Sequence, residues 1–170
     1  SLPTDHPLYI GNCGMHGKYA SNKAVSECDV LFSIGTRFND RITGDLNEFA
    51  PKAKIIHIDI DTAEIGKNLG PTIPLVGDAG EIFERLLEED FSLDMDPWIR
   101  ELTEIKKSTV DHRTFSSRLV NPNLLVQRLS EKMEADAVYV ADVGQNQLWS
   151  ADNYVMKNGR FLTTGGMGTM

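Results

Sequence analysis

Short runs of apolar residues alternate with segments of helical periodicity over the first half of the chain. Residues 29–34 are mostly apolar, residues 54–60 are rich in isoleucine, and a shorter apolar run at 74–76 ends at Gly77. Runs of this length, bounded by glycine or charged residues, predict buried strands. Residues 21–28 have a helical pattern that Ser21 could cap, and Asp78 can cap a second helix. Strands that alternate with helices predict the α/β class, with a parallel sheet and helices packed on its faces.

This alternation stops at an acidic stretch, residues 88–96, which marks an expected domain boundary. Asp96-Pro97 and Asn121-Pro122 then each open an expected helix, because proline suits the first helical position and a capping residue precedes it. A further apolar run at 137–141 predicts another strand. We therefore expect a first domain at residues 1–90, a helical link at 91–120, and the start of a second, incomplete domain at 121–170.

The composition is that of an acidic globular chain. Its 170 residues are 41% hydrophobic and 25% charged, and the net charge is −8. An acidic chain without a basic stripe argues against nucleic acid and against an anionic membrane as partners. No apolar run reaches the roughly 18 residues that a membrane span needs, and the first residues lack the pattern of a signal peptide.

The cysteines and the first residue add two expectations. Cys13 and Cys28 form no C-x-x-C pair, which suits a reducing cytoplasm. Because the chain begins with Ser1 rather than methionine, we expect it to be cut from a longer parent.

Two strand ends carry residues that suit a nucleotide ligand. Gly35 follows the first run, and Arg37 and Arg41 come soon after it. Glycine lets a ligand approach the backbone, and arginine can hold phosphate oxygens or a ring carbonyl. Asp59 ends the next run, where dinucleotide-binding folds place a carboxylate, although a full G-x-G-x-x-G pattern is missing. Solvated arginines on a surface turn and a helix-capping carboxylate are the alternative interpretations; His57, within the run, is interpreted as structural.

Glycine-rich segments supply the remaining candidates. Gly14-Met15-His16-Gly17 predicts a tight loop against something flat. A zinc site that joins this histidine with the two cysteines matches no defensible spacing, so no metal ligand is predicted. Residues 142–147 and 164–168 combine glutamine amides with glycine backbone, which suits a neutral heteroaromatic ligand. A helix cap and a glycine turn are the alternative interpretation of these two segments.

Taken together, these segments resemble acetolactate synthase (acetohydroxyacid synthase), a family of thiamine-diphosphate-dependent enzymes. The strings similar to its middle domain are Gly14–Gly17, Ile34–Gly44, Ile56–Asn68 and Val76–Ala79. Asp142–Gln145 and Gly165–Met170 are similar to the start of its thiamine-diphosphate domain. The resemblance implies a Rossmann-like parallel sheet flanked by helices, followed by an incomplete second α/β domain.

The resemblance also implies an activity. Enzymes of this family condense pyruvate with a second 2-keto acid such as 2-ketobutyrate, with loss of carbon dioxide. The products, 2-acetolactate or 2-aceto-2-hydroxybutyrate, lead to branched-chain amino acids. The implied cofactors are thiamine diphosphate, Mg²⁺ and FAD, of which FAD takes no net redox part. The implied assembly is a cytoplasmic homodimer or homotetramer, with a regulatory small subunit as a further partner.

Carried over position by position, the resemblance implies which residues meet the cofactors. The expected FAD contacts of the first domain are Gly14, Met15, His16, Gly35, Thr36, Arg37, Arg41, Ile42, Asp59, Ile60, Asp78 and Ala79. The expected flavin contacts of the next domain are Gln147, Leu148 and Gly165. The expected positions around thiamine diphosphate are Gln145, Asn146, Gly168 and Met170.

No catalytic residue and no metal ligand is expected within the chain. The family's activating glutamate belongs to an upstream domain, and its magnesium motif would follow Met170. We therefore expect the chain alone to be inactive.

The sequence departs from the family at a few positions. Asn39 stands where aspartate is usual, Asn146 where histidine is usual, and Leu148 where methionine is common. Asparagine donates a hydrogen bond but does not titrate, which puts a proton role at position 146 in doubt. The alternative function is an independent FAD- or NAD-binding module, such as an electron-transfer flavoprotein domain, but its complete glycine-rich phosphate loop is not found. A non-enzymatic interaction domain is a third interpretation.

Overall fold

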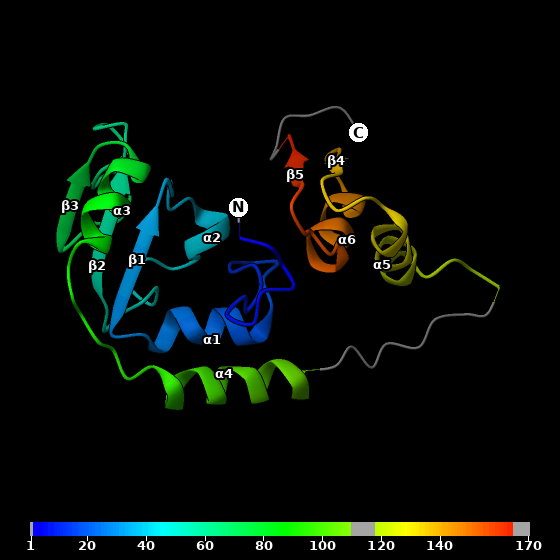
Figure 1. Cartoon of the computed structure of the whole chain (residues 1–170), viewed down its shortest axis with the longest axis horizontal. Helices are drawn as coiled ribbons and strands as arrows, with labels where there is room; N and C mark the ends of the chain where they lie inside the picture. Colours follow the sequence, from blue (N-terminus) through cyan, green and yellow to red (C-terminus); the bar gives the residue numbers. More distant parts are fainter. Residues whose placement is uncertain (1, 110–117, 165–170) are drawn as a thin grey trace.

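The computed structural model describes residues 2–109 and 118–164. Three parallel strands, β1 (Val30–Ile34), β2 (Lys54–Asp59) and β3 (Ile73–Val76), form the first sheet in the order β1-β2-β3 (Figure 1). The register pairs Ile34 with Ile58 and Ile58 with Leu75. Isoleucine, valine and leucine supply most of these positions, because β-branched and aliphatic side chains suit a sheet that is packed between layers.

Helical segments lie against both faces of this sheet. On one face, Phe83 of α3 (Ala79–Leu87) contacts Phe32 of β1, with ring centroids 5.8 Å apart. Phe32 pairs with Ile56, and side chains alternate along a strand, so the next residue, His57, points to the opposite face. There its ring contacts that of Phe38, with ring centroids 4.9 Å apart. Phe38 lies two residues before the short helix α2 (Asp40–Thr43). Below the sheet in Figure 1, α1 (Tyr19–Glu27) packs along α4 (Asp96–Ser108).

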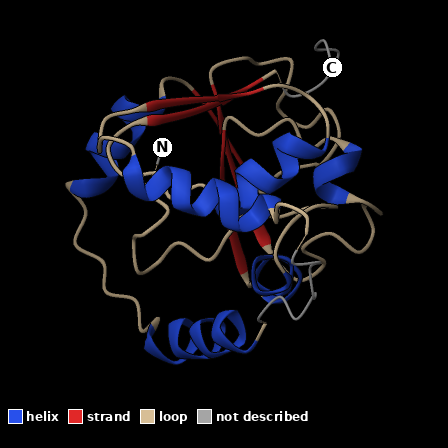
Figure 2. Ribbon diagram, turned by 90° about the vertical axis from the view of Figure 1, so that its right-hand side faces the viewer, coloured by secondary structure: helices blue, strands red, loops and turns tan. Residues whose placement is uncertain are grey.

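A second, smaller sheet follows along the chain. Its strands, β4 (Val138–Ala141) and β5 (Arg160–Thr163), are parallel and accompany α5 (Pro122–Lys132) and α6 (Gln145–Asn153). Figure 2 shows the two sheets as separate groups of strands. The core of this part consists of Val126, Tyr154 and Met156, with partly buried neighbours packed on them. Parallel sheets flanked by helices in both parts confirm the predicted α/β class.

The N-terminal segment ties the two parts together. Thr4 donates its backbone N–H to the Met156 carbonyl at 2.9 Å, and the Asn12 amide donates to the Ala151 carbonyl at 3.0 Å. Lys18 forms an ion pair with Asp152 at 3.1 Å. No helix in residues 2–109 or 118–164 is long and apolar enough to cross a membrane.

Several local expectations differ from the structure. The first helix begins at Tyr19, so Ser21 lies inside it and does not cap it; its hydroxyl donates to the Lys18 carbonyl at 2.8 Å instead. Asp96 is already helical, and Met95 precedes it without a capping side-chain bond. The runs at 29–34 and 74–76 do form strands, but most of their side chains are not buried: Phe32 stays 38% exposed and Val76 54% exposed, while Ser33 is buried. Asp78 and Asn121 do cap their helices as expected.

Candidate functional site

The carboxyl ends of the three parallel strands meet at one edge of the first sheet. Gly35, just after β1, donates its N–H to the Ile58 carbonyl at 2.8 Å. Gly77, just after β3, donates to the Asp59 carbonyl at 3.1 Å. The structure therefore brings Gly35, Asp59 and Asp78 to the same edge, which is where open α/β sheets bind ligands.

Gly35 leaves open space at this edge. Its φ is +59°, and a Cβ placed on it would meet no atom within 4 Å. Thr36 donates its hydroxyl to the Ile34 carbonyl at 3.3 Å, and the Arg37 carbonyl accepts from the Asn68 amide at 2.9 Å. The backbone of this turn is thus held on two sides, while the Arg37 side chain remains exposed.

The other two strand ends present a carboxylate and an apolar side chain. One oxygen of Asp59 accepts from the Asp61 N–H at 2.9 Å. Its neighbour Ile60 is 74% exposed, which is unusual for an isoleucine at the end of a core strand. Asp78 accepts from Gly80 N at 2.8 Å and Glu81 N at 3.2 Å, so at least one of its oxygens serves the α3 cap, and Ala79 begins that helix.

A second group of the predicted residues forms where the glycine-rich loop docks on α2. Met15 donates its N–H to the Arg41 carbonyl at 2.8 Å. The side-chain amide of Asn22 forms two hydrogen bonds with the Gly14 backbone: its oxygen accepts from the Gly14 N–H at 2.7 Å, and its nitrogen donates to the Gly14 carbonyl at 2.9 Å. A Cβ on Gly14 would lie 2.6 Å from the Arg41 carbonyl oxygen. Close contact between the loop and α2 therefore requires glycine at position 14.

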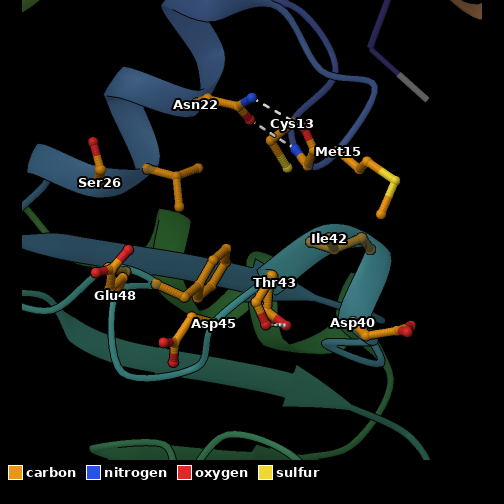
Figure 3. A pocket seen from close by; sticks show the side chains of 14 residues that line it. Cys13, Met15, Asn22, Ser26, Asp40, Ile42, Thr43, Asp45 and Glu48 are labelled. Atoms are coloured by element: carbon orange, nitrogen blue, oxygen red, sulfur yellow. Dashed lines mark hydrogen bonds between the residues drawn. The ribbon is translucent and has the colours of Figure 1, made fainter.

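The same loop lines a cleft of about 380 Å³ between α1 and the segment that follows α2 (Figure 3). Gly14, Met15 and Ile42 lie on it, together with the apolar side chains of Val25 and Phe49. Its polar lining includes three carboxylates, those of Asp40, Asp45 and Glu48. Gly35, Asp59 and Asp78 do not line this cleft, so the predicted FAD residues of the first domain do not all share one surface.

A third group joins the two parts of the chain. His16 from the glycine-rich loop and Leu148 from α6 line one cleft of about 440 Å³, with Tyr154 and Phe161 in its wall. Cys13 lies beside them, and desolvation raises the pKa of its thiol. Two residues that are far apart in the sequence, and that were both predicted to meet a flavin, are thus brought to one surface.

The residues predicted around thiamine diphosphate are only partly described. Gln145 and Asn146 begin α6 and are exposed, after Gly144 with a φ of +117°. Gln147, on the same helix, donates its backbone N–H to the Gly144 carbonyl at 3.1 Å. Gly165, Gly168 and Met170 lie outside the described residues. Among the residues that the structure describes, no cluster of three or more metal-ligating side chains occurs.

Comparison with known proteins decides which family this geometry belongs to. The family model of the thiamine pyrophosphate enzyme central domain matches residues 1–86, just over half of the chain. The chain belongs to the thiamine pyrophosphate enzyme family. The resemblance described from the sequence is therefore confirmed.

Curated relatives also match the part of the chain that follows the central domain. It is 47% identical over 179 residues to the probable acetolactate synthase large subunit of Methanocaldococcus jannaschii, covering 99% of this chain and 30% of that protein. It is 40% identical to the acetolactate synthase large subunit of Corynebacterium glutamicum, covering all of this chain and 28% of that protein. It is 38% identical to the acetolactate synthase isozyme 2 large subunit of Escherichia coli, covering all of this chain and 31% of that protein. The chain thus spans less than a third of the length of these relatives.

Two buried residues next to Asp59 at the strand-end edge were not found as site residues from the sequence: His57 and Phe38. His57 is completely buried within β2, which agrees with a structural residue, but the sequence did not indicate that its Nε2 lies 4.0 Å from a carboxylate oxygen of Asp59. Phe38 was not singled out, yet it is buried at a φ of +46° and packs on His57. The spacing of His57 and Asp59, two apart on a strand, was the available signal, because such residues share a face. A positive φ at phenylalanine has no signal in the sequence.

Proposed function

We propose that this chain is a segment of an acetolactate synthase large subunit, the catalytic subunit that condenses pyruvate with a second 2-keto acid. The observation that carries the proposal is the match of the whole chain, at 38–47% identity, to proteins named acetolactate synthase. Coverage of less than a third of each relative's length supports a segment rather than a separate enzyme. The chain alone is then inactive, because most of the relatives' length has no counterpart in it.

We propose that FAD binds along the strand-end edge. The open space at Gly35 supports this, since no atom lies within 4 Å of a Cβ placed there and a ligand could approach the backbone closely. Arg37 would hold phosphate oxygens or a ring carbonyl through its exposed guanidinium, and Asp59 would accept from a ribose hydroxyl. Ile60 offers an exposed apolar surface beside them. This edge therefore suits a nucleotide ligand, with anionic phosphates for Arg37 and a planar ring system that can lie on Ile60.

The flavin ring would extend toward the glycine-rich loop and α6. The cleft shared by His16 and Leu148 supports this part of the proposal, because it is lined by both parts of the chain and has aromatic walls. The Asn22 bonds and the Arg41 carbonyl hold the loop in place before any ligand arrives. Such preorganisation reduces the conformational entropy that binding has to overcome.

Thiamine diphosphate would lie near the start of α6. Bound there, it would supply the electron sink for decarboxylation of the keto acid. Within this chain, the amides of Gln145 and Asn146 would donate and accept hydrogen bonds, without moving a proton. Mg²⁺ would be held by residues beyond this segment. Boundaries near residues 90 and 120 between the FAD part, the helical link and the thiamine-diphosphate part belong to the same proposal.

We also propose that the complete subunit assembles with further polypeptide chains. Exposed apolar side chains on α5, namely Leu124, Leu125 and Leu129, support burial of this face by further polypeptide. We expect the complete subunit to form a homodimer or homotetramer in the cytoplasm, with pyruvate and 2-ketobutyrate as substrates and a regulatory small subunit as a further partner.

The test is acetolactate formation by the complete large subunit that contains this segment, supplied with pyruvate, thiamine diphosphate, Mg²⁺ and FAD. We expect 2-acetolactate to accumulate, and mixed product when 2-ketobutyrate is added; the 170-residue chain alone should give neither. A complete subunit that binds thiamine diphosphate but releases only acetaldehyde would contradict the proposal. Tight binding of NAD in place of FAD, measured by calorimetry, would favour the independent nucleotide-binding module instead.

A further inference from the structure

His57 is the most completely buried ionisable side chain next to the strand-end edge. Its side chain is 0% exposed, and neither ring nitrogen has a hydrogen-bond partner among the described residues. A neutral imidazole still carries one N–H donor and one acceptor nitrogen. A buried polar group without a partner is costly, and an exception of this kind in a folded protein calls for an explanation.

The nearest polar atom beyond the ring belongs to Asp59. His57 and Asp59 are two residues apart on β2, so their side chains lie on the same face of the sheet. The His57 Nε2 atom is 4.0 Å from Asp59 Oδ2. The other carboxylate oxygen, Oδ1, already accepts from the Asp61 N–H at 2.9 Å. The geometry therefore leaves Oδ2 facing the imidazole, while a carboxylate keeps further lone pairs for a ligand.

The opposite side of the imidazole is closed by an aromatic ring. The rings of Phe38 and His57 meet edge to face, with centroids 4.9 Å apart and an interplanar angle of 74°. Phe38 holds a φ of +46°, which is unfavourable for a bulky side chain, and it is buried by contacts with both His57 and Phe49. Phe38 directly follows Arg37 in the sequence, so the ring that covers His57 belongs to the same turn as Arg37.

From this geometry we infer that His57 is a positioning residue for FAD: its Nε2–H orients the Asp59 carboxylate toward the ligand's ribose hydroxyl. The inference rests on the proposed FAD site. The separation is 4.0 Å, and rotation of the Asp59 carboxylate that brings Oδ2 about 1 Å closer would make it a hydrogen bond. That bond gives the buried imidazole its missing partner and fixes the carboxylate at the same time. His57 itself touches no ligand, because Phe38 and the sheet enclose it.

The test measures FAD affinity of the complete large subunit by flavin fluorescence. His57→Leu keeps the volume and removes the donor, and we expect it to weaken FAD by about tenfold, the usual effect of one lost hydrogen bond to a charged group. His57→Gln carries an amide N–H in place of Nε2–H and should restore most of that loss. In an Asp59→Ala background, His57→Leu should have no further effect, whereas a purely structural role would weaken FAD equally in both backgrounds.

Ile55→Ala is the matched control. Ile55 lies on the same strand and the same face, two residues before His57, and is also buried. This variant should lower the melting temperature without changing FAD affinity. A second measurement, ¹⁵N NMR of selectively labelled histidine in the wild-type subunit, should show the His57 proton on Nε2; a proton on Nδ1 alone would overturn the inference even if His57→Leu does not fold.

The remaining outcomes separate this inference from the proposed function. If Asp59→Ala weakens FAD while His57→Leu binds it as the wild type does, His57 has no positioning role and the FAD site stands. If the wild-type subunit binds no FAD, both the site and the inference are wrong. If His57→Leu and Asp59→Ala each weaken FAD and the double variant shows additive losses, His57 acts through the fold and the inference is overturned.

Discussion

Replacing Gly14 by alanine should destabilise the chain far more than the loss of one surface glycine usually does. Two effects combine at this position. The φ of +100° is strained for any residue with a side chain, and a Cβ would lie 2.6 Å from the Arg41 carbonyl oxygen and 3.0 Å from the Ile42 Cα. Backbone strain of this kind costs about 1–3 kcal/mol. Overpacking against backbone atoms costs about a further 1–3 kcal/mol.

The sum, about 2–6 kcal/mol, is a large part of the total stability of roughly 5–15 kcal/mol that a domain has. Two matched alanine variants separate the two effects. Gly44 has a φ of +60° and no atom within 4 Å of an added Cβ, so Gly44→Ala reports strain alone. Gly70 has open space without a positive φ, so Gly70→Ala should be neutral or stabilising by up to about 1 kcal/mol.

The assay is urea unfolding of the 170-residue chain followed by circular dichroism. We expect the free energy of unfolding to fall in the order Gly70→Ala, Gly44→Ala, Gly14→Ala, with unchanged dependence on urea concentration. The Gly14→Ala variant should be at least about 1 kcal/mol less stable than Gly44→Ala. Equal stabilities for these two variants would show that the loop does not press against α2, and the argument for a preformed loop would fail.

Three further predictions concern a helix cap, the ligand edge and a thiol. Asn121→Ala should lower the free energy of unfolding in urea by about 1 kcal/mol, because the Asn121 side chain accepts from N–H groups in the first turn of α5. An unchanged urea midpoint would show that the cap contributes nothing. Arg37→Ala in the complete subunit should weaken FAD by about 1–3 kcal/mol, as measured by calorimetry, while Arg85→Ala on the exposed surface of α3 should leave FAD affinity unchanged. Burial, and secondarily the Asp29 carboxylate, raises the pKa of the Cys28 thiol. Less thiolate is then present at a given pH, so alkylation of Cys28 should be slower in the folded chain than in urea, and equal rates would refute this. Folding stability should also fall as the pH rises from the pKa of the unfolded thiol through the higher pKa of the folded thiol.

The strands of the first sheet could be predicted from the sequence because their signal is local and continuous. Runs of isoleucine, valine and leucine that end at Gly35 and Gly77 leave little choice of element. The strand β5 (Arg160–Thr163) gave no comparable signal, because four residues without alternation or a flanking turn motif do not stand out. Its position depends on pairing with β4, which is a tertiary contact.

Helix ends were predictable where a side chain does the capping. Asn39 illustrates a case that the sequence left open, since the resemblance marked it only as a departure from aspartate. In the structure its side chain accepts from Ile42 N at 3.1 Å and caps α2. Asparagine and aspartate cap equally well, so this substitution preserves the local structure. Ser21, in contrast, has a good capping side chain but lies within the helix, because the chain is already helical from Tyr19.

The strand-end edge and the glycine-rich loop are held in place by different contacts. Parallel register alone brings Gly35 and Asp59 together, so any sequence that preserves the sheet preserves this edge. The glycine-rich loop depends instead on the Asn22 bonds and on the Met15–Arg41 bond. A change at Gly14 should therefore weaken FAD through the loop while leaving the strand-end contacts intact, whereas a change at His57 should do the reverse. Measuring FAD affinity of a Gly14→Ala, His57→Leu double variant tests this separation: independent groups require additive losses, and strong coupling would mean that the edge and the loop move as one unit.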